Sequence, residues 1–440
     1  MTKGKVTIIG AGLSGPLMAT LLAKSDYAVD IYERRPDMRK KSMSAGRSIN
    51  LALSARGIQA LKDVGIYGQV EPNIIPMKGR MIHDRQGKTH LQPYGQRNDE
   101  VIFSVSRSEL NMVLMDQAEN TGKVNIYFDR SLIGADLDKK ELEFEDGNVP
   151  FDIVMGSDGS SSILRRSIIE KNRANFIKKP LGHGYKELTI PASKTGNYLI
   201  DPKALHIWPR GEFMLIALPN TDRSFTCTLF FPMTGECSFE TIKDKTAILD
   251  LFQREFPDTL DIIPSLVKDF QTNPTGNLAT VYCDQWHYED RALMFGDAAH
   301  AIVPFFGQGM NASFQDCSVI NHLIKKYEGN WEKIFYQFSN SHVQNGHAIA
   351  DMALENYIEM RDSVNNKEYK KRRELELVLE KKFRDKFIPR YSMVSFHQIP
   401  YSKVYKRGQI QLDLMNRYLS NELTKAELYD QIDKQLEPIR

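Results

Sequence analysis

The N-terminal stretch of residues 6–15 most limits what this chain can fold into. Its sequence, V-T-I-I-G-A-G-L-S-G, places Gly10, Gly12 and Gly15 in the spacing G-x-G-x-x-G directly after a run of β-branched residues. In such a unit the first glycine permits a tight turn, the second lets backbone approach a pyrophosphate, and the third lets the helix pack on the strand. Unpaired N–H groups at the helix N-terminus favour the phosphates. The pattern predicts a helix over 16–23 and a dinucleotide site at its start.

A second strand, predicted over 28–32, ends at Glu33, 18 positions after Gly15. An acidic residue at this place accepts hydrogen bonds from an adenosine ribose. The next two residues, Arg34 and Arg35, either lie near a cofactor phosphate or are solvated. A glycine-rich turn in some other α/β protein is the alternative, but strand, glycines, helix, strand and acid in register favour dinucleotide binding.

The composition is that of a globular protein with two or three domains: 440 residues, 41% hydrophobic and 26% charged. A net charge of +2 gives no reason to expect nucleic acid. No apolar run approaches the roughly 18 residues of a membrane span, and no signal peptide precedes the first strand, so a soluble cytoplasmic protein is expected. A zinc site or disulfide framework is not expected, because no two of the four cysteines are spaced as a C-x-x-C pair: Cys227, Cys237, Cys283 and Cys317.

Strand-like and helix-like segments alternate in a way that predicts an α/β fold with a split first domain and an inserted sheet. The first, Rossmann-like domain takes residues 1–75, 104–181 and 281–330. A mostly antiparallel substrate domain takes residues 76–103 and 182–280, and a helical C-terminal region takes residues 331–440.

Local patterns add further expectations. A strand over 47–54 leads to a helix over 55–64, with Ser54 placed to cap it and Gly65 to end it. Residues 137–146 indicate a charged surface hairpin, and one helix near 243–256 interrupts the antiparallel strands. A repeat at every fourth position predicts an amphipathic helix, packed on its own protein or on a membrane surface, from Leu375, Leu379, Phe383 and Phe387.

Three predicted strands end in small residues with an acid: the first glycine turn with Glu33, the D-G turn at Asp158 and the G-D turn at Asp297. A nicotinamide dehydrogenase needs only the first, whereas an extended flavin dinucleotide needs more contacts along one groove. Asp297 is placed to accept from a ribityl hydroxyl. A helix predicted over 309–323 can direct its N-terminus at the pyrimidine ring, where negative charge develops on reduction.

With these three elements in order, the chain resembles the single-component FAD-dependent aromatic hydroxylases. The closer likeness is to members that act on L-kynurenine, through A-G-R-S-I-N-L-A-L-S-A-R-G at 45–57, P-F-F-G-Q-G-M-N-A at 304–312 and M-A-L-E-N-Y-I-E-M-R-D at 352–362. The resemblance implies an FAD-binding domain and 3-hydroxylation of L-kynurenine with NADPH and O2. In that family a flavin C4a-hydroperoxide transfers its terminal oxygen to the ring, so no catalytic side chain and no metal is expected.

The resemblance also implies the binding residues. It assigns the substrate carboxylate to Arg80, Tyr94, Asn356 and Tyr391, with Tyr357 and Glu359 close by and Phe305 and Phe306 as aromatic walls. Besides the three glycines, it assigns the cofactor to Leu13, Glu33, Arg34, Ala52, Arg107, Leu132, Asp158, Asp297, Met310 and Asn311.

Asn356 has an argument of its own. On a helix over 346–362 it shares a face with Ile349, Met352, Ala353 and Met360. A polar side chain on an apolar face needs a hydrogen-bond partner, since leaving it unpaired costs roughly 1–3 kcal/mol. Either a substrate carboxylate or a backbone carbonyl can provide one.

Some alternatives stay open at the level of sequence. The carboxylate-binding set suits other amino-bearing aromatic acids as well as kynurenine, and a flavin-binding module without turnover is a further possibility. No second glycine pattern marks an NADPH site. Mitochondrial relatives end in a hydrophobic anchor, whereas the polar C-terminus of this chain predicts none.

Overall fold

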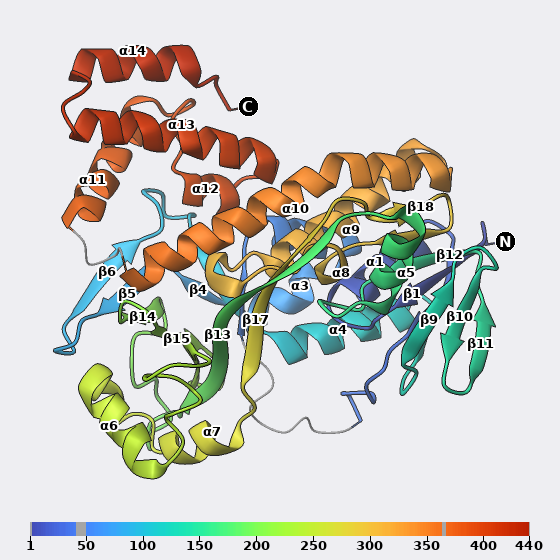
Figure 1. The fold of residues 1–440 in the computed structure, drawn as a ribbon, viewed down its shortest axis with the longest axis horizontal. Helices are drawn as coiled ribbons and strands as arrows, with labels where there is room; N and C mark the ends of the chain where they lie inside the picture. Colours follow the sequence, from blue (N-terminus) through green and yellow to red (C-terminus); the bar gives the residue numbers. More distant parts are fainter. Residues whose placement is uncertain (1, 41–49, 363–366, 440) are drawn as a thin grey trace.

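The computed structural model describes residues 2–40, 50–362 and 367–439 (Figure 1). Six strands form one sheet: β1 (Lys5–Ile9), β2 (Ala28–Tyr32), β8 (Val124–Tyr127), β12 (Ile153–Gly156), β18 (His287–Tyr288) and β19 (Ala292–Met294). Their order is β18-β19-β12-β1-β2-β8, parallel throughout except for β18 at one edge. The predicted α/β class and the predicted strand over 28–32 are confirmed.

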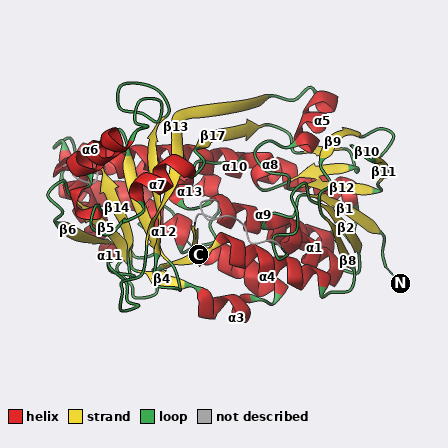
Figure 2. Cartoon of the chain, turned by 90° about the horizontal axis from the view of Figure 1, so that it is seen from below, coloured by secondary structure: helices red, strands yellow, loops and turns green. Residues whose placement is uncertain are grey.

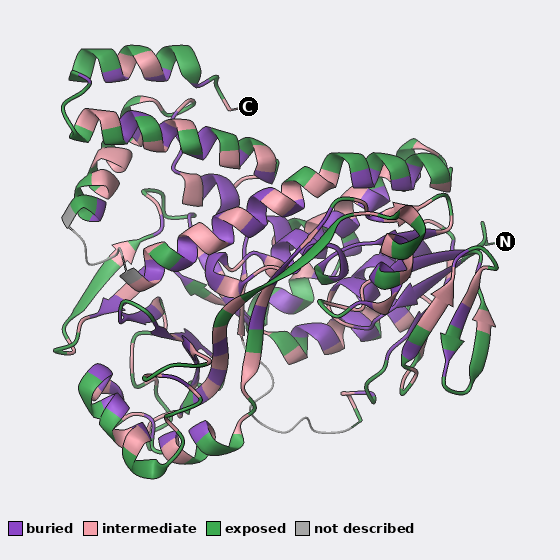
Figure 3. Ribbon diagram, viewed as in Figure 1, coloured by how far each residue is buried: buried purple, intermediate pink, exposed green. Residues whose placement is uncertain are grey.

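Helices pack beside this parallel sheet (Figure 2). The glycine turn leads into α1 (Ser14–Lys24), which contacts α4 (Arg107–Glu119) and α9 (Gly309–Lys326). Leu17 and Leu22 of α1 are fully buried in one core with Ile8 and Val29 of the sheet. The third helix, α9, also packs along α2 (Ala55–Val64). The central strands β1, β2, β12 and β19 are almost wholly buried, whereas the edge strands β8 and β18 are partly exposed (Figure 3).

A second sheet has seven strands: β5 (Gly79–His83), β6 (Thr89–Pro93), β13 (Phe176–Ile190), β14 (Leu205–Pro209), β15 (Met214–Pro219), β16 (Phe225–Pro232) and β17 (Gly276–Cys283). Their order is β17-β13-β16-β15-β14-β5-β6. Only the β14–β5 pair is parallel, so the sheet is mostly antiparallel, as the sequence predicts.

The two faces of the seven-stranded sheet have different neighbours, because successive side chains of a strand point to opposite faces. Leu215 and Leu229 pack in a core with α6 (Lys245–Glu255) and α7 (Leu266–Thr272). Met214 and Phe230 belong to a separate core on the other face. The sequence predicts α6 near 243–256 but misses α7, whose seven residues carry too short a helical period to stand out.

Two short sheets correct the local predictions. Residues 137–146 fall in a three-stranded sheet of β9 (Leu132–Asp136), β10 (Glu141–Phe144) and β11 (Gly147–Pro150). Its charged edge is exposed, but Leu137, Leu142 and Phe144 are buried in the main core, so the segment is not wholly a surface hairpin. Alternation in a strand gives it one buried face.

The predicted strand over 47–54 appears as β3 (Asn50–Leu53), paired with β7 (Ile102–Ser106), which in turn pairs with β4 (Ile75–Met77). Residues 45–49 of the family motif lie outside the described residues. The helix over 55–64 is confirmed as α2, ended by Gly65 at φ +81°. Ser54 does not cap it through its side chain; its hydroxyl instead accepts a hydrogen bond from Gln308 Nε2 at 3.4 Å.

The C-terminal region consists of α10 (Trp331–Asp362), α11 (Lys367–Lys382), α12 (Arg390–Ser395), α13 (Tyr401–Leu419) and α14 (Lys425–Gln435). Of the four residues of the predicted amphipathic helix, Leu375 and Leu379 lie on α11, whereas Phe383 and Phe387 follow its end at Lys382, so the helix is shorter than predicted. The apolar side chains pack on the protein itself, since Leu379 and Phe387 are fully buried in a cluster with Leu414 of α13 and Leu428 of α14. No helix within the described ranges is both long enough and apolar enough to cross a bilayer.

Candidate functional site

The glycine turn between β1 and α1 uses each glycine for a different reason. Gly10 has φ +103°, and a Cβ there would lie 2.6 Å from the carbonyl oxygen of Ser157. A Cβ on Gly15 would lie 2.0 Å from the carbonyl oxygen of Gly10, so helix and strand approach too closely for any side chain. A Cβ on Gly12 would meet nothing within 4 Å, which leaves backbone accessible on that side. This is the arrangement that the spacing predicts.

A cavity of about 680 Å³ runs from this turn, between the two large sheets, to the C-terminal helices. We call its first part the turn end, where the three predicted turns meet. Eleven of the thirteen residues predicted to hold the cofactor line the cavity: Gly10, Gly12, Leu13, Glu33, Arg34, Ala52, Arg107, Leu132, Asp158, Asp297 and Met310.

The two other predicted cofactor residues, Gly15 and Asn311, do not line it. Gly15 lies beneath the turn, as described above. The Asn311 side chain is fully buried and bonded to backbone: Oδ1 accepts from Ser54 N at 2.9 Å, and Nδ2 donates to Ala52 O at 2.8 Å. Asn311 therefore ties the start of α9 to the segment carrying Ala52.

Glu33 is buried at the end of β2, beside the glycine turn. Its Oε2 accepts a hydrogen bond from Ala11 N at 2.8 Å, and its Oε1 accepts from Arg35 Nε at 2.8 Å. Burial disfavours the charged carboxylate, but the Arg35 pair outweighs it and holds the pKa of Glu33 below its usual value. Of the two adjacent arginines, Arg35 thus pairs with Glu33, whereas Arg34 is exposed at the cavity.

Asp158 follows β12 and provides the second turn. Its Oδ2 accepts from Ile163 N at 2.7 Å at the start of α5 (Ile163–Asn172), while its Oδ1 is buried without a partner among the described residues. Burial raises the pKa of this carboxyl group. A buried oxygen with free lone pairs in a cavity wall is suited to accept from a ligand hydroxyl or N–H group.

The third turn is built on two residues that the sequence reading misses, His300 and Asp316. Asp297 begins α8 (Asp297–His300) and is exposed toward the cavity. Asp316 Oδ2, on α9, accepts from Gly296 N at 2.9 Å and lies 2.6 Å from His300 Nε2. Burial disfavours the charged imidazole, but Asp316 outweighs it and raises the pKa of His300. The pair fixes the turn that presents Asp297, and their 16-residue separation gives no local signal.

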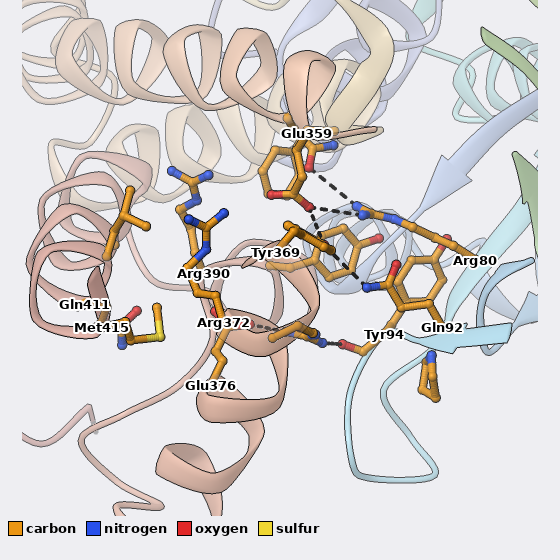
Figure 4. Close-up of a pocket in the computed structure, with 17 residues that line it drawn as sticks. Arg80, Gln92, Tyr94, Glu359, Tyr369, Arg372, Glu376, Arg390, Gln411 and Met415 are labelled. Atoms are coloured by element: carbon orange, nitrogen blue, oxygen red, sulfur yellow. Dashed lines mark hydrogen bonds and ion pairs between the residues drawn. The ribbon is translucent and has the colours of Figure 1, made fainter. Parts of the chain in front are cut away.

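The opposite part of the cavity, which we call the arginine end, brings together four residues from three distant segments: Arg80 and Tyr94 from the β5–β6 hairpin, Asn356 on α10 and Tyr391 on α12. Arg80 Cζ lies 5.0 Å from the Tyr391 ring centroid, and the rings of Tyr391 and Tyr94 stack at 4.9 Å. Arg80, Tyr94 and Tyr391 line the cavity directly. Asn356 lines an adjoining pocket of about 130 Å³, drawn in Figure 4, which shares those three residues.

The charge of Arg80 is balanced within this cluster. Nη1 lies 3.3 Å from Glu359 Oε1, which also accepts from the Tyr369 hydroxyl at 2.9 Å (Figure 4). Burial alone would lower the pKa of Arg80, but Glu359 outweighs it, so the pKa is raised. Burial alone would raise the pKa of Glu359, but Arg80 outweighs it and the net shift is downward. Both groups therefore stay ionised, although Arg80 is buried and Glu359 is only partly exposed.

Two polar side chains at the arginine end, Asn356 and Tyr94, differ in whether they have hydrogen-bond partners among the described residues. Asn356 is buried, and both ends of its amide have partners: Nδ2 donates to the backbone carbonyl of Phe305 at 2.7 Å, and Oδ1 accepts a long hydrogen bond from Arg80 Nη2 at 3.5 Å. The Tyr94 hydroxyl is buried and no group of the described chain is in hydrogen-bonding geometry with it. A buried unpaired hydroxyl facing a cavity next to a guanidinium suits an anionic ligand.

Between the two ends the cavity wall is apolar. It includes side chains from the seven-stranded sheet, from the short 3-10 turn Pro304–Phe306 and from α10: Leu205, Met214, Ile216, Leu218, Phe230, Leu278, Phe305, Phe306 and Met360. Phe305 and Phe306, predicted as aromatic walls, do line it. This surface can hold a planar ring and exclude water from it.

The sequence is similar to proteins of known activity along almost its whole length. The FAD binding domain family matches residues 3–333. A kynurenine 3-monooxygenase of Myxococcus xanthus is 44% identical over 97% of this chain and 93% of its own length. One of Anopheles gambiae is 41% identical over 94% of this chain and 86% of its own length. This chain belongs to the kynurenine 3-monooxygenase family.

The fold is shared more widely than the sequence. A 2-methyl-3-hydroxypyridine-5-carboxylic acid oxygenase has a TM-score of 0.67 at 17% identity, with 82% of this chain and 93% of that chain covered. A tetracycline destructase has a TM-score of 0.63 at 18% identity, with 90% and 99% covered. At these identities the likeness concerns architecture alone. Membership of the kynurenine 3-monooxygenase family agrees with the predicted FAD cofactor. The structure fits this cofactor through the glycine turn, the unpaired Asp158 oxygen and the long cavity.

Proposed function

We propose that this protein hydroxylates L-kynurenine to 3-hydroxykynurenine with NADPH and O2, using bound FAD. One observation carries the proposal: a single cavity connects three turns suited to a flavin dinucleotide with a buried arginine–tyrosine cluster suited to a carboxylate, across apolar walls. Curated relatives over 40% identical that are named kynurenine 3-monooxygenase support the same reaction.

At the turn end, backbone and carboxylates hold the cofactor. The exposed side of Gly12 and the N-terminus of α1 accept the pyrophosphate, and Glu33, Asp158 and Asp297 accept hydrogen bonds from ribose or ribityl hydroxyls. The N-terminus of α9 at Met310 directs its dipole at the ring system. Bound FAD would supply the redox chemistry that the side chains lack, namely acceptance of a hydride from NADPH and activation of O2.

At the arginine end, side chains hold the substrate. The guanidinium of Arg80 and the hydroxyls of Tyr94 and Tyr391 bind the α-carboxylate of kynurenine, and Asn356 holds the Phe305 backbone against this site. A charge-assisted arginine pair fixes orientation as well as position. The apolar walls then hold the ring over the flavin and exclude water. The amino group of the ring activates its own ortho carbon, so no protein base is needed there.

The experiment is turnover by the purified protein. It should be yellow, and L-kynurenine should accelerate NADPH oxidation and yield 3-hydroxykynurenine. A panel of other amino-bearing aromatic acids separates this reaction from a broader hydroxylase. The proposal fails if kynurenine neither accelerates NADPH oxidation nor is hydroxylated.

A further inference from the structure

Arg56, on α2, is a buried cation without a charged partner. It is only 1% exposed, and no carboxylate in the described parts of the chain forms an ion pair with it. Its guanidinium donates instead to three uncharged oxygens: Nε to Val394 O at 3.2 Å, Nη1 to Gln315 Oε1 at 2.8 Å and Nη2 to Ile399 O at 2.5 Å. Burying an arginine costs free energy unless such bonds compensate it. These three bonds compensate for the burial of the Arg56 charge, and they also connect separate parts of the chain.

These bonds join elements from both ends of the cavity. Arg56 stands four residues after Ala52, which lines the turn end, and Gln315 belongs to α9, which begins at that end. Val394 is the fifth residue of α12, the helix that carries Tyr391 to the arginine end. Ile399 follows the same helix. Arg56 thus lies between the cofactor elements and the helix that presents a substrate-binding side chain.

The short helix α12 depends on such a contact for its orientation. It has six residues, too few to be stable alone, so tertiary contacts decide where it lies. Val394 O is one of the carbonyls that a helix leaves unpaired in its last turn, where a cation is favoured. The Tyr401 ring covers the other side of the guanidinium, with Arg56 Cζ 4.0 Å from its centroid. The Tyr401 hydroxyl in turn donates to Gln308 Oε1 at 2.9 Å.

We propose that Arg56 is a positioning residue for the substrate site: it fixes α12, and so holds the Tyr391 hydroxyl where it meets the kynurenine carboxylate. This inference rests on the proposed function, because it assigns Tyr391 to the substrate. Arg56 touches neither ligand, and its effect passes through Val394 and Ile399.

The test is the dissociation constant of L-kynurenine, measured with the holoenzyme by perturbation of the flavin spectrum without NADPH. Arg56→Lys keeps the charge but cannot reach three acceptors, so the constant should rise about tenfold, with KM rising and kcat nearly unchanged. In a Tyr391→Phe background, the same change should add almost nothing, because the hydroxyl that it positions is gone.

A matched control is Arg165→Lys. Arg165 is also a buried arginine bound to backbone carbonyls, Ala298 O at 2.7 Å and Ser160 O at 2.8 Å, but it stands on α5 and does not line the cavity. At saturating FAD, the dissociation constant of kynurenine for Arg165→Lys should stay within about twofold of the wild-type value. This should hold even if the thermal stability falls as much as in Arg56→Lys.

Each outcome decides the inference. An unchanged constant in Arg56→Lys, or an equal rise with and without the Tyr391 hydroxyl, overturns it. Where Arg56→Lys does not fold, Gln315→Met removes one acceptor alone and should still raise the constant about threefold, and no rise there contradicts the inference. Wild-type protein that does not bind kynurenine contradicts the proposed function instead.

Discussion

The turn end and the arginine end of the cavity are built in different ways. At the turn end, backbone geometry makes the site: three tight turns, a helix N-terminus and carboxylates placed directly after strands. At the arginine end, side chains make it: four residues that meet from segments up to 311 positions apart, between Arg80 and Tyr391. The turn end should therefore be sensitive to added volume at single glycines, and the arginine end to lost charge and hydrogen bonds.

The largest effect is expected from volume added at the turn end. In Gly15→Ala the new methyl group would lie 2.0 Å from Gly10 O, where neither backbone can yield. We expect a loss of about 3–5 kcal/mol in the free energy of unfolding and no retention of FAD. Urea unfolding of the apoprotein and FAD titration measure both.

Gly12→Ala is the matched control, since its methyl group would meet no protein atom within 4 Å. The apoprotein should keep its stability within about 1 kcal/mol, while FAD affinity falls by about 100-fold because the methyl group takes space beside the pyrophosphate. Equal stability losses in both variants would show that the two glycines do not have the separate roles described.

At the arginine end the largest effect should come from Arg80→Met. The loss of a desolvated carboxylate pair should cost roughly 2–5 kcal/mol in kcat/KM for kynurenine, mainly through KM, with FAD content unchanged. Steady-state kinetics with a flavin assay measure this. Arg85, which lies on the turn after β5 with a side chain 60% exposed, provides the control. Arg85→Met should leave both kcat/KM for kynurenine and the FAD content unchanged. Unchanged kinetics in Arg80→Met would remove Arg80 from the site.

The same contrast explains how much the sequence could predict. The glycine turn is local: strand, glycines, helix and acid lie within 33 residues, so spacing alone predicts α1, β2 and the role of Glu33. Asp158 and Asp297 are predicted for the same reason, because each lies within three residues of the end of a buried strand. The strand and helix boundaries were close wherever one hydrophobic period continued for a full element, as in α2 and β16.

The arginine end could not be derived from spacing. Nothing in the local sequence indicates that Arg80, on a short strand, meets Asn356 and Tyr391; a resemblance to a family assigned them. Asn356 alone carries an internal signal, as a polar residue on an apolar helix face, but that signal does not distinguish a substrate carboxylate from the Phe305 carbonyl, which is the partner of its Nδ2. Contacts across such separations, including Arg56 with α12, depend on tertiary packing that no local pattern encodes.

Two buried histidines should make the stability of the protein depend on pH in opposite directions. His206, on β14 behind the arginine end, has Nδ1 2.8 Å from His83 Nε2, and burial lowers its pKa to about 4. The native state therefore binds this proton more weakly than the unfolded state, and stability should fall as pH drops from about 6.5 to about 4, by about 3 kcal/mol. Urea unfolding across this range should show a shallower fall in His206→Gln.

His300, at the turn end, should behave in the opposite sense. Its pKa is raised by Asp316, so its contribution is complete below about 6.5 and is lost as pH rises through the native pKa. His300→Gln should therefore destabilise the protein more in acid than in mildly alkaline solution. The same direction of pH dependence in both histidine variants would contradict this assignment.

The smallest effect is expected at Asn356, a side chain at the arginine end that is hydrogen-bonded to a backbone carbonyl. Asn356→Leu keeps the volume but leaves Phe305 O without its 2.7 Å donor, which should cost about 1–2 kcal/mol of stability. The kynurenine KM should rise only about threefold to tenfold, because Asn356 holds the Phe305 backbone and accepts only a long hydrogen bond, 3.5 Å, from Arg80 Nη2. Thermal unfolding and kinetics measure the two effects. A KM increase as large as that of Arg80→Met, with stability unchanged, would mean that the amide turns from the carbonyl to bind the substrate carboxylate itself.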